Sequence, residues 1–236
     1  MKFSELARRT GASTASLKFW MREGILPAGE LRNQTTAVYT QRHVERVGLI
    51  QILREEFDAS IGRIHDLTAL IDSPESSLLD VMEACQVIAT GMVIPPDVDA
   101  AQAELIARLR ERMGWSHYNS VAASALAHAL AGSARVGYPY DLDDLVLYGQ
   151  ALEPIATADI GSIQPEGTPD AVARNLLVAA AAQNRVLVAV NQLAHTAAAI
   201  RATTADDADV GASGVEDRVQ VADRVAPAET VDLEQH

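Results

Sequence analysis

The 236-residue chain has 32 acidic and 19 basic side chains, a formal net charge of -13, and 48% hydrophobic residues. That hydrophobic content suffices for the cores of one small and one medium domain. The single cysteine, Cys85, excludes an internal disulfide and a cysteine-rich metal site. No secretory leader pattern and no uninterrupted apolar run of bilayer length is present, so we expect a soluble cytoplasmic protein without membrane contact.

The first predicted element is a pair of short helices within residues 4–27. Ser4 is a predicted N-cap, and Gly11 suits the left-handed conformation that ends a helix. Ser13 then caps the second helix, and Gly24 can end it. This order predicts a helix-turn-helix.

The second of these helices has two faces when drawn at 3.6 residues per turn. Its inner face carries Leu17, Trp20 and Met21, and its outer face carries Ala15, Lys18, Phe19 and Arg22. Two amphipathic helices around a glycine also occur in helical domains without DNA-binding function. The charge distribution favours DNA, because residues 1–54 hold nine Lys or Arg against four Asp or Glu in an otherwise acidic chain.

The order SELARRTGAS, LKFWMREGILP, a polar stretch to Tyr39 and then HVERVGLIQILRE resembles the MerR-type winged helix-turn-helix, over roughly residues 1–72. The resemblance implies a dimeric transcription regulator whose segment Ser13 to Phe19 enters the major groove, with Leu31 to Tyr39 as the wing. Ala37 stands where the family commonly has a phosphate-binding arginine. The predicted DNA contacts are Ser13, Thr14, Ala15, Lys18, Phe19, Arg22, Arg32, Asn33, Gln34, Tyr39 and Arg42.

Two further helices complete this predicted DNA-binding domain, which we place at residues 1–74. Thr40 caps a helix with an apolar stripe, from which Arg42 and Arg46 are able to reach phosphate. Ser60 caps the last helix, which ends at Asp72-Ser73-Pro74. His43 and His65 are isolated, and we expect surface hydrogen bonding from them.

Residues 75–202 are predicted to form an all-helical dimerisation and effector domain, since alanine is frequent and Pro or Gly clusters cut the segment into helix-length pieces. It is similar to the effector domains of TetR-type regulators in architecture only. The expected fold class is therefore all-α with a small β wing. The predicted helices lie near 76–92, 98–113, 119–133, 141–161 and 169–202, the last of them as one long helix or two.

A homodimer is expected because one small module offers too few base contacts for useful specificity. The dimer helix that usually follows a MerR-type module is long and heptad-like. Here the candidate Asp97 to Met113 would span only about 25 Å at about 1.5 Å per residue. The Ala-rich final helix is the alternative, because its small side chains permit close helix packing.

Five of the ten aromatic residues lie within positions 115–148. Tyrosine suits binding pockets because it combines an apolar face with a polar tip. These rings either line a pocket for a small hydrophobic effector or fill helix junctions. The candidate pocket residues are Trp115, Tyr118, Tyr138, Tyr140 and Tyr148.

Catalysis is not expected, and neither is a metal or an organic cofactor. The histidines His117, His128 and His195 have no metal-ligand spacing, and no GxSxG, HExxH, Walker or dinucleotide motif is present. Asp141, Asp143 and Asp144 are predicted to lie at a helix N-terminus.

Residues 203–236 form an acidic tail, which we expect to be mostly disordered. The tail either aids solubility or mimics DNA and screens the basic module. The sequence as a whole predicts a homodimeric, ligand-responsive transcription regulator bound to double-stranded DNA in a bacterial nucleoid. The alternative is a constitutive DNA-anchored module whose helical domain binds another protein.

Overall fold

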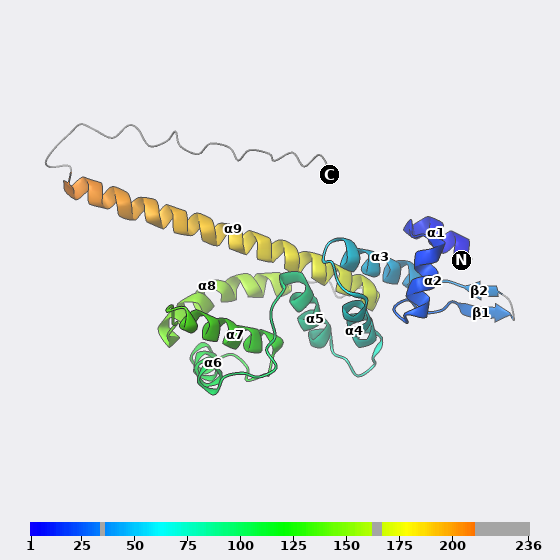
Figure 1. Ribbon diagram of the computed structural model, residues 1–236, viewed down its shortest axis with the longest axis horizontal. Helices are drawn as coiled ribbons and strands as arrows, with labels where there is room; N and C mark the ends of the chain where they lie inside the picture. Colours follow the sequence, from blue (N-terminus) through cyan, green and yellow to red (C-terminus); the bar gives the residue numbers. More distant parts are fainter. Residues whose placement is uncertain (34–35, 162–166, 211–236) are drawn as a thin grey trace, which may run out of the picture. The chain divides into compact units, whose positions relative to one another are not determined.

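The computed structural model describes residues 1–33, 36–161 and 167–210, and it describes the side chains of these residues except at 32, 33, 36 and 205–210. The described chain is mostly helical with one two-stranded sheet (Figure 1). This confirms the predicted all-α class with a small β wing. By its internal contacts the chain forms two units, residues 1–186 and 187–236.

The first two helices are α1 (Phe3–Thr10) and α2 (Thr14–Arg22). Gly11 ends α1 with a φ of 68°, and the Ser13 hydroxyl caps α2 by accepting a hydrogen bond from the Ser16 N–H at 3.0 Å, both as predicted. The predicted cap at Ser4 is wrong, because Lys2 is the N-cap of α1. The Lys2 carbonyl oxygen accepts hydrogen bonds from the Glu5 and Leu6 N–H groups, each at 3.0 Å, so the first helical turn begins at Phe3.

The wing consists of β1 (Glu30–Asn33) and β2 (Thr36–Val38), which pair antiparallel with Leu31 opposite Ala37. It is followed by α3 (Gln41–Glu55) and α4 (Ile61–Asp72). The Ser60 hydroxyl accepts a hydrogen bond from the Arg63 N–H and caps α4, as the sequence predicts.

The remaining helices match the predicted segments closely. Asp141 and Asp144 accept hydrogen bonds from each other's backbone N–H at the start of α8, which confirms their predicted place at a helix N-terminus. The last segment is a single helix that continues to Val210, so the predicted disorder is wrong for residues 203–210, and the rest of the predicted tail, residues 211–236, lies outside the described residues. The helices are α5 (Leu78–Thr90), α6 (Ala100–Met113), α7 (Val121–Arg135), α8 (Leu142–Gly161) and α9 (Pro169–Val210).

Two hydrophobic cores lie within residues 1–186. One is formed by α6, α7 and α8 around Ile106, Leu130 and Leu145. The other is built mainly by α1 to α4, and α5 and the start of α9 add Cys85, Ile88, Ala173 and Leu177 to it. Residues 1–74 therefore supply most of this core but not all of it, and the predicted boundary at residue 74 stays a prediction.

One described helical stretch, Pro169–Thr204, is long and apolar enough to cross a membrane by length and composition alone. The sequence predicts no such span. The same stretch contains Arg174 and Arg185, and its first turns contribute Ala173 and Leu177 to a protein core. Only 11% of its most apolar window is buried, but a single such helix is weak evidence for a membrane span, because helices of soluble proteins pass the same test of length and composition.

Candidate nucleic-acid interface

The outer face of α2 is an exposed surface of polar and basic side chains. Thr14, Ala15, Lys18 and Arg22 are exposed, whereas Leu17 on the opposite face is completely buried. Phe19 and Trp20 are half-buried. The predicted two faces of the helix are present, although Phe19 is less exposed than the rest of its face, and the exposed face carries the polar and basic side chains of a groove-reading helix.

Arg22 is held in place on this face without losing its exposure. Its guanidinium carbon lies 5.3 Å from the centroid of the Phe19 ring, a cation–π contact, and its Nε is 3.6 Å from the Glu23 carboxylate. The Arg22 side chain remains 71% exposed. Lys18 has no ion-pair partner among the residues that the structure describes.

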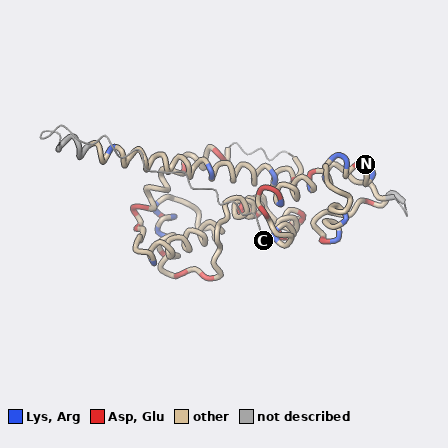
Figure 2. The backbone as a smooth tube through the Cα atoms, turned by 45° about the horizontal axis from the view of Figure 1, so that its top comes forward, with Lys and Arg blue, Asp and Glu red and all other residues tan. Residues whose placement is uncertain are grey.

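Lys and Arg residues recur along the tube close to the N-terminus (Figure 2). Some of them are neutralised locally, as Arg8 is by Glu5 at 2.7 Å. Others remain exposed, including Lys2, Arg9 and Lys18. These charges give the N-terminal part a positive surface within an acidic chain, the electrostatic property that phosphate contact requires.

The predicted wing contacts are only partly visible. Gln34 lies outside the described residues, as do the side chains of Arg32 and Asn33. The backbone of the latter two residues belongs to β1, so both are carried by the wing. Their contacts with DNA stay predictions.

Tyr39 is buried at the base of the wing rather than exposed on it. Its ring centroid is 5.6 Å from that of Phe3 and 5.2 Å from that of His43. A Cβ at Gly29 would lie 2.9 Å from the Tyr39 ring, so a glycine is needed there. Burial also raises the pKa of Tyr39. The ring therefore supports the wing from inside, and a DNA contact by Tyr39 stays a prediction.

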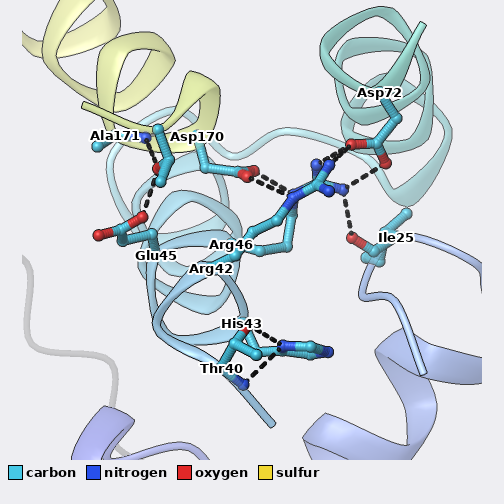
Figure 3. Close-up of polar contacts among 10 residues, drawn as sticks. Ile25, Thr40, Arg42, His43, Glu45, Arg46, Asp72, Asp170 and Ala171 are labelled. Atoms are coloured by element: carbon cyan, nitrogen blue, oxygen red, sulfur yellow. Dashed lines mark hydrogen bonds and ion pairs between the residues drawn. The ribbon is translucent and has the colours of Figure 1, made fainter. Parts of the chain in front are cut away.

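Arg46 does not reach the surface, so its predicted phosphate contact is wrong. Its side chain is 1% exposed and lies between two carboxylates, Asp72 at 2.6 Å and Asp170, as Figure 3 shows. Burial acts to lower the pKa of Arg46, but the hydrogen bonds to both carboxylates outweigh it and raise the pKa. Its neighbour Arg42 is half-exposed, with Nη2 2.7 Å from Asp72, so its predicted DNA contact competes with this ion pair.

His43 also differs from its expected surface position. It is buried, and its Nδ1 accepts a hydrogen bond from the Thr40 backbone N–H at 3.1 Å (Figure 3). Thr40 is the N-cap of α3, as predicted, and the two residues form a capping box in which His43 has the part usually played by Glu or Gln.

The candidate pocket aromatics lie in two different settings. Tyr138, Tyr140 and Tyr148 line a recess of about 270 Å³, with the last two rings 6.2 Å apart. Trp115 instead lies over Gly149 and donates its indole N–H to Glu153 at 3.1 Å. Tyr118 is outside the recess as well. The structure brings together three of the five predicted residues.

A second hollow, of about 290 Å³, lies between α5, α8 and the first half of α9, and sequence reasoning missed it. The sequence does contain one indication of this hollow. Its lining residues on α9 follow one another at alternating intervals of four and three positions, which places them on one helix face: Val172, Leu176, Ala179 and Gln183. Among the described residues, no group of three or more His, Cys, Asp or Glu could hold a metal ion.

The helix pair α1–α2, the exposed basic face of α2 and the following two-stranded wing together define a winged helix-turn-helix domain. Comparison with known families agrees, since residues 1–70 match the MerR HTH family regulatory proteins. The N-terminal domain is therefore a helix-turn-helix domain of the MerR type.

The fold of a larger part of the chain has a counterpart among solved structures. The crystal structure of the putative transcriptional regulator SCO5550 from Streptomyces coelicolor A3(2) superimposes with a TM-score of 0.58 at 23% identity. The match covers 85% of this chain and 97% of that one, and at this identity it establishes the fold alone. No curated protein matches the chain. The family match of residues 1–70 supports DNA-binding transcription regulation.

Proposed function

We propose that the chain is a homodimeric transcription regulator that binds double-stranded DNA sequence-specifically and responds to a small ligand. Each N-terminal domain reads one half-site, with α2 in the major groove and the wing beside the phosphates. The observation that carries this proposal is the exposed face of α2, where Lys18 and Arg22 stand opposite the buried Leu17 in a MerR-type domain. Such a face supplies both base-edge and phosphate contacts.

Selection of bound fragments from random-sequence DNA, using the full-length protein, tests this part of the proposal. We expect a palindromic operator whose half-sites are separated by one helical turn or a multiple of it, about 10 base pairs each. Binding without any enriched sequence would contradict sequence-specific recognition. An enriched single half-site would contradict the two-fold arrangement.

The second half of α9 is the proposed dimer contact. Val186, Val190, Leu193, Ala197 and Ile200 follow one another at four-three spacing, the repeat of a coiled-coil seam. Four of these five side chains are large and exposed, Leu193 to 69%, which is unusual for a helix without a partner. A second copy of the same helix would cover this stripe, and the dimer would then contain two DNA-binding domains.

The dimer is tested by light scattering on two variants of the full-length protein. Leu193→Asp places a charge in the stripe and is expected to yield a monomer that binds the operator more weakly. His195→Asp is the matched control, because position 195 is exposed on the opposite side of the helix. A wild-type monomer, or equal effects of both substitutions, would contradict the proposed seam.

The proposed ligand response rests on the two hollows in residues 1–186. A second candidate function, a DNA-anchored protein that binds another protein constitutively, is favoured by exposed Leu147, Leu152 and Ile155 on α8. A melting screen with small hydrophobic compounds separates the two. Ligand binding raises the melting temperature by mass action, whereas a protein-binding surface leaves it unchanged.

A further inference from the structure

The cavity between α5, α8 and α9 is lined by apolar and polar side chains. Met82, Ile160, Leu176 and Ala180 are among the apolar ones, and Gln86, Asn175, Asp159 and Gln183 are the polar ones; the last two are hydrogen-bonded to each other and are called the polar end. Its volume of about 290 Å³ is close to the lower limit of small-molecule sites, about 300 Å³. The cavity is thus suited to a compact molecule with both an apolar body and a polar group.

The charge at the polar end is negative. Asp159 is the single charged residue among those described as lining the cavity, and no Lys or Arg lines it. The Gln183 side-chain amide donates a hydrogen bond to the Asp159 carboxylate, which fixes this carboxylate against α9. Asp159 also lies in the last turn of α8, where the helix dipole adds negative partial charge. Both features favour a cation over an anion.

We propose that this cavity binds a small organic cation, with its apolar body against Met82 and Leu176 and its ammonium group beside Asp159. The inference deepens the proposed ligand response and rests on it, because it assigns both the site and the chemical class of the effector. An ammonium at this position gains a charge-assisted hydrogen bond while its apolar body leaves water.

The cavity is connected to the DNA-binding domain through the first turns of α9. Val172 lines the cavity and lies two residues after Asp170, which is paired with Arg46 of α3. Ala173 and Leu177, on the face of α9 next to the cavity-lining residues, belong to the same core as Leu17 of α2. Occupancy of the cavity therefore stabilises the packing of α9 against the DNA-binding domain, which contains α2.

The test uses the full-length protein and three probes of similar size, hexylammonium, hexanol and hexanoate, in calorimetric titration and thermal melting. We expect hexylammonium to bind most tightly and to raise the melting temperature, and hexanoate to bind least. Asp159→Asn should weaken hexylammonium binding by about tenfold or more and leave hexanol binding unchanged, the loss expected for one charge-assisted hydrogen bond. Ala180→Phe should abolish binding of both by filling the cavity.

Asp144→Asn in the tyrosine recess is the matched control and should leave all three affinities unchanged. The proposal is overturned if hexylammonium does not bind, if hexanoate binds equally well, or if Asp144→Asn and not Asp159→Asn reduces binding. It is also overturned if Ala180→Phe changes the oligomeric state while the probes never bind, which would make the hollow part of a subunit contact. Operator binding is measured on the same preparations. A protein that binds DNA but not hexylammonium would contradict this inference and leave the proposed DNA recognition intact.

Discussion

Arg46 of α3 and Asp170 of α9 form an ion pair in which both side chains are buried, 1% and 0% exposed, although they are far apart in the sequence. The Asp170 carboxylate also lies near Arg42, with 3.8 Å between Oδ2 and Nε. On the other side, Arg46 contacts Asp72 at the end of α4. The pair fastens the first turn of α9 to the DNA-binding part of the chain.

Removing Asp170 should be costly, because it leaves the buried Arg46 with only the partly exposed Asp72 as a counter-charge. We expect Asp170→Ala to lower the free energy of unfolding by roughly 3 to 5 kcal/mol, measured by urea denaturation. Glu5→Ala, which breaks the exposed pair with Arg8, is the control and should have little effect.

The double variant Arg46→Leu with Asp170→Leu should recover a large part of the lost stability, since an apolar replacement of a buried pair is often neutral. A double variant less stable than Asp170→Ala would show that the two residues are independent.

The acid stability of the protein should depend on Asp72. Its pKa lies below the ordinary 3.8, because hydrogen bonds and ion pairs with Arg46 and Arg42 outweigh the effect of burial. Since the folded state lowers this pKa, the contribution of Asp72 is complete above about pH 4 and is lost as the pH falls through the folded-state value. Burial raises the pKa of Asp170, so that residue acts in the opposite direction.

We therefore expect Asp72→Asn to be less stable than the wild type at about pH 6, with the difference shrinking toward about pH 3 in urea titrations. A difference that stays constant over this range would contradict the lowered pKa of Asp72.

DNA binding should depend on the two exposed cations of α2, Lys18 and Arg22. Lys18→Ala and Arg22→Ala are each expected to weaken operator binding and to reduce the slope of log affinity against log salt by about 1, because each variant loses one phosphate contact. Arg108→Ala on α6 is the matched control, an exposed arginine outside the domain. Unchanged salt slopes for both α2 variants would remove this face from the interface.

The sequence predicted the helix-turn-helix well because its signals are local. Caps at Ser13 and Ser60, the left-handed Gly11 and the 3.6-residue spacing of α2 all act within a few residues. Burial within one helix face is harder to predict, since Leu17 is completely buried while Trp20 beside it is half-exposed. The difference depends on how closely the other helices approach, which spacing alone does not determine.

This difference gives a prediction about stability. Leu17→Ala should cost about 2 to 5 kcal/mol of unfolding free energy, the usual range for a fully buried leucine. Trp20→Ala should cost less, although tryptophan is larger, because its side chain is only partly buried against the core. Chemical denaturation of both variants compares them directly, and a larger loss for Trp20→Ala would place it deeper in the core than its exposure indicates.

Contacts over long sequence distances were not predictable in this way. Arg46 stands one turn before the buried Ile50 on α3, so its spacing indicates an inward position, but nothing local identifies Asp170 as its partner. The same holds for the cavity, whose lining comes from three helices. In both cases the sequence pattern indicates which residues of one helix point inward. Which residues of the other helices they meet depends on the fold.

Cys85 should report on the contact between α5 and α9. Its thiol is completely buried and within hydrogen-bond reach of the Ala173 carbonyl oxygen, with 3.6 Å between Sγ and the oxygen. Burial raises the pKa of Cys85 to about 12 from 9.0, which lowers the reactive thiolate fraction about a thousandfold at neutral pH. We expect Ellman's reagent to react far more slowly with the native protein than with the urea-unfolded chain or with free cysteine.

Asp170→Ala, which loosens the first turn of α9, should react faster than the wild type in the absence of urea. Rapid reaction of the native wild type would mean that α9 leaves α5 frequently in solution, and an unchanged rate in Asp170→Ala would mean that the ion pair with Arg46 does not hold α9 in place.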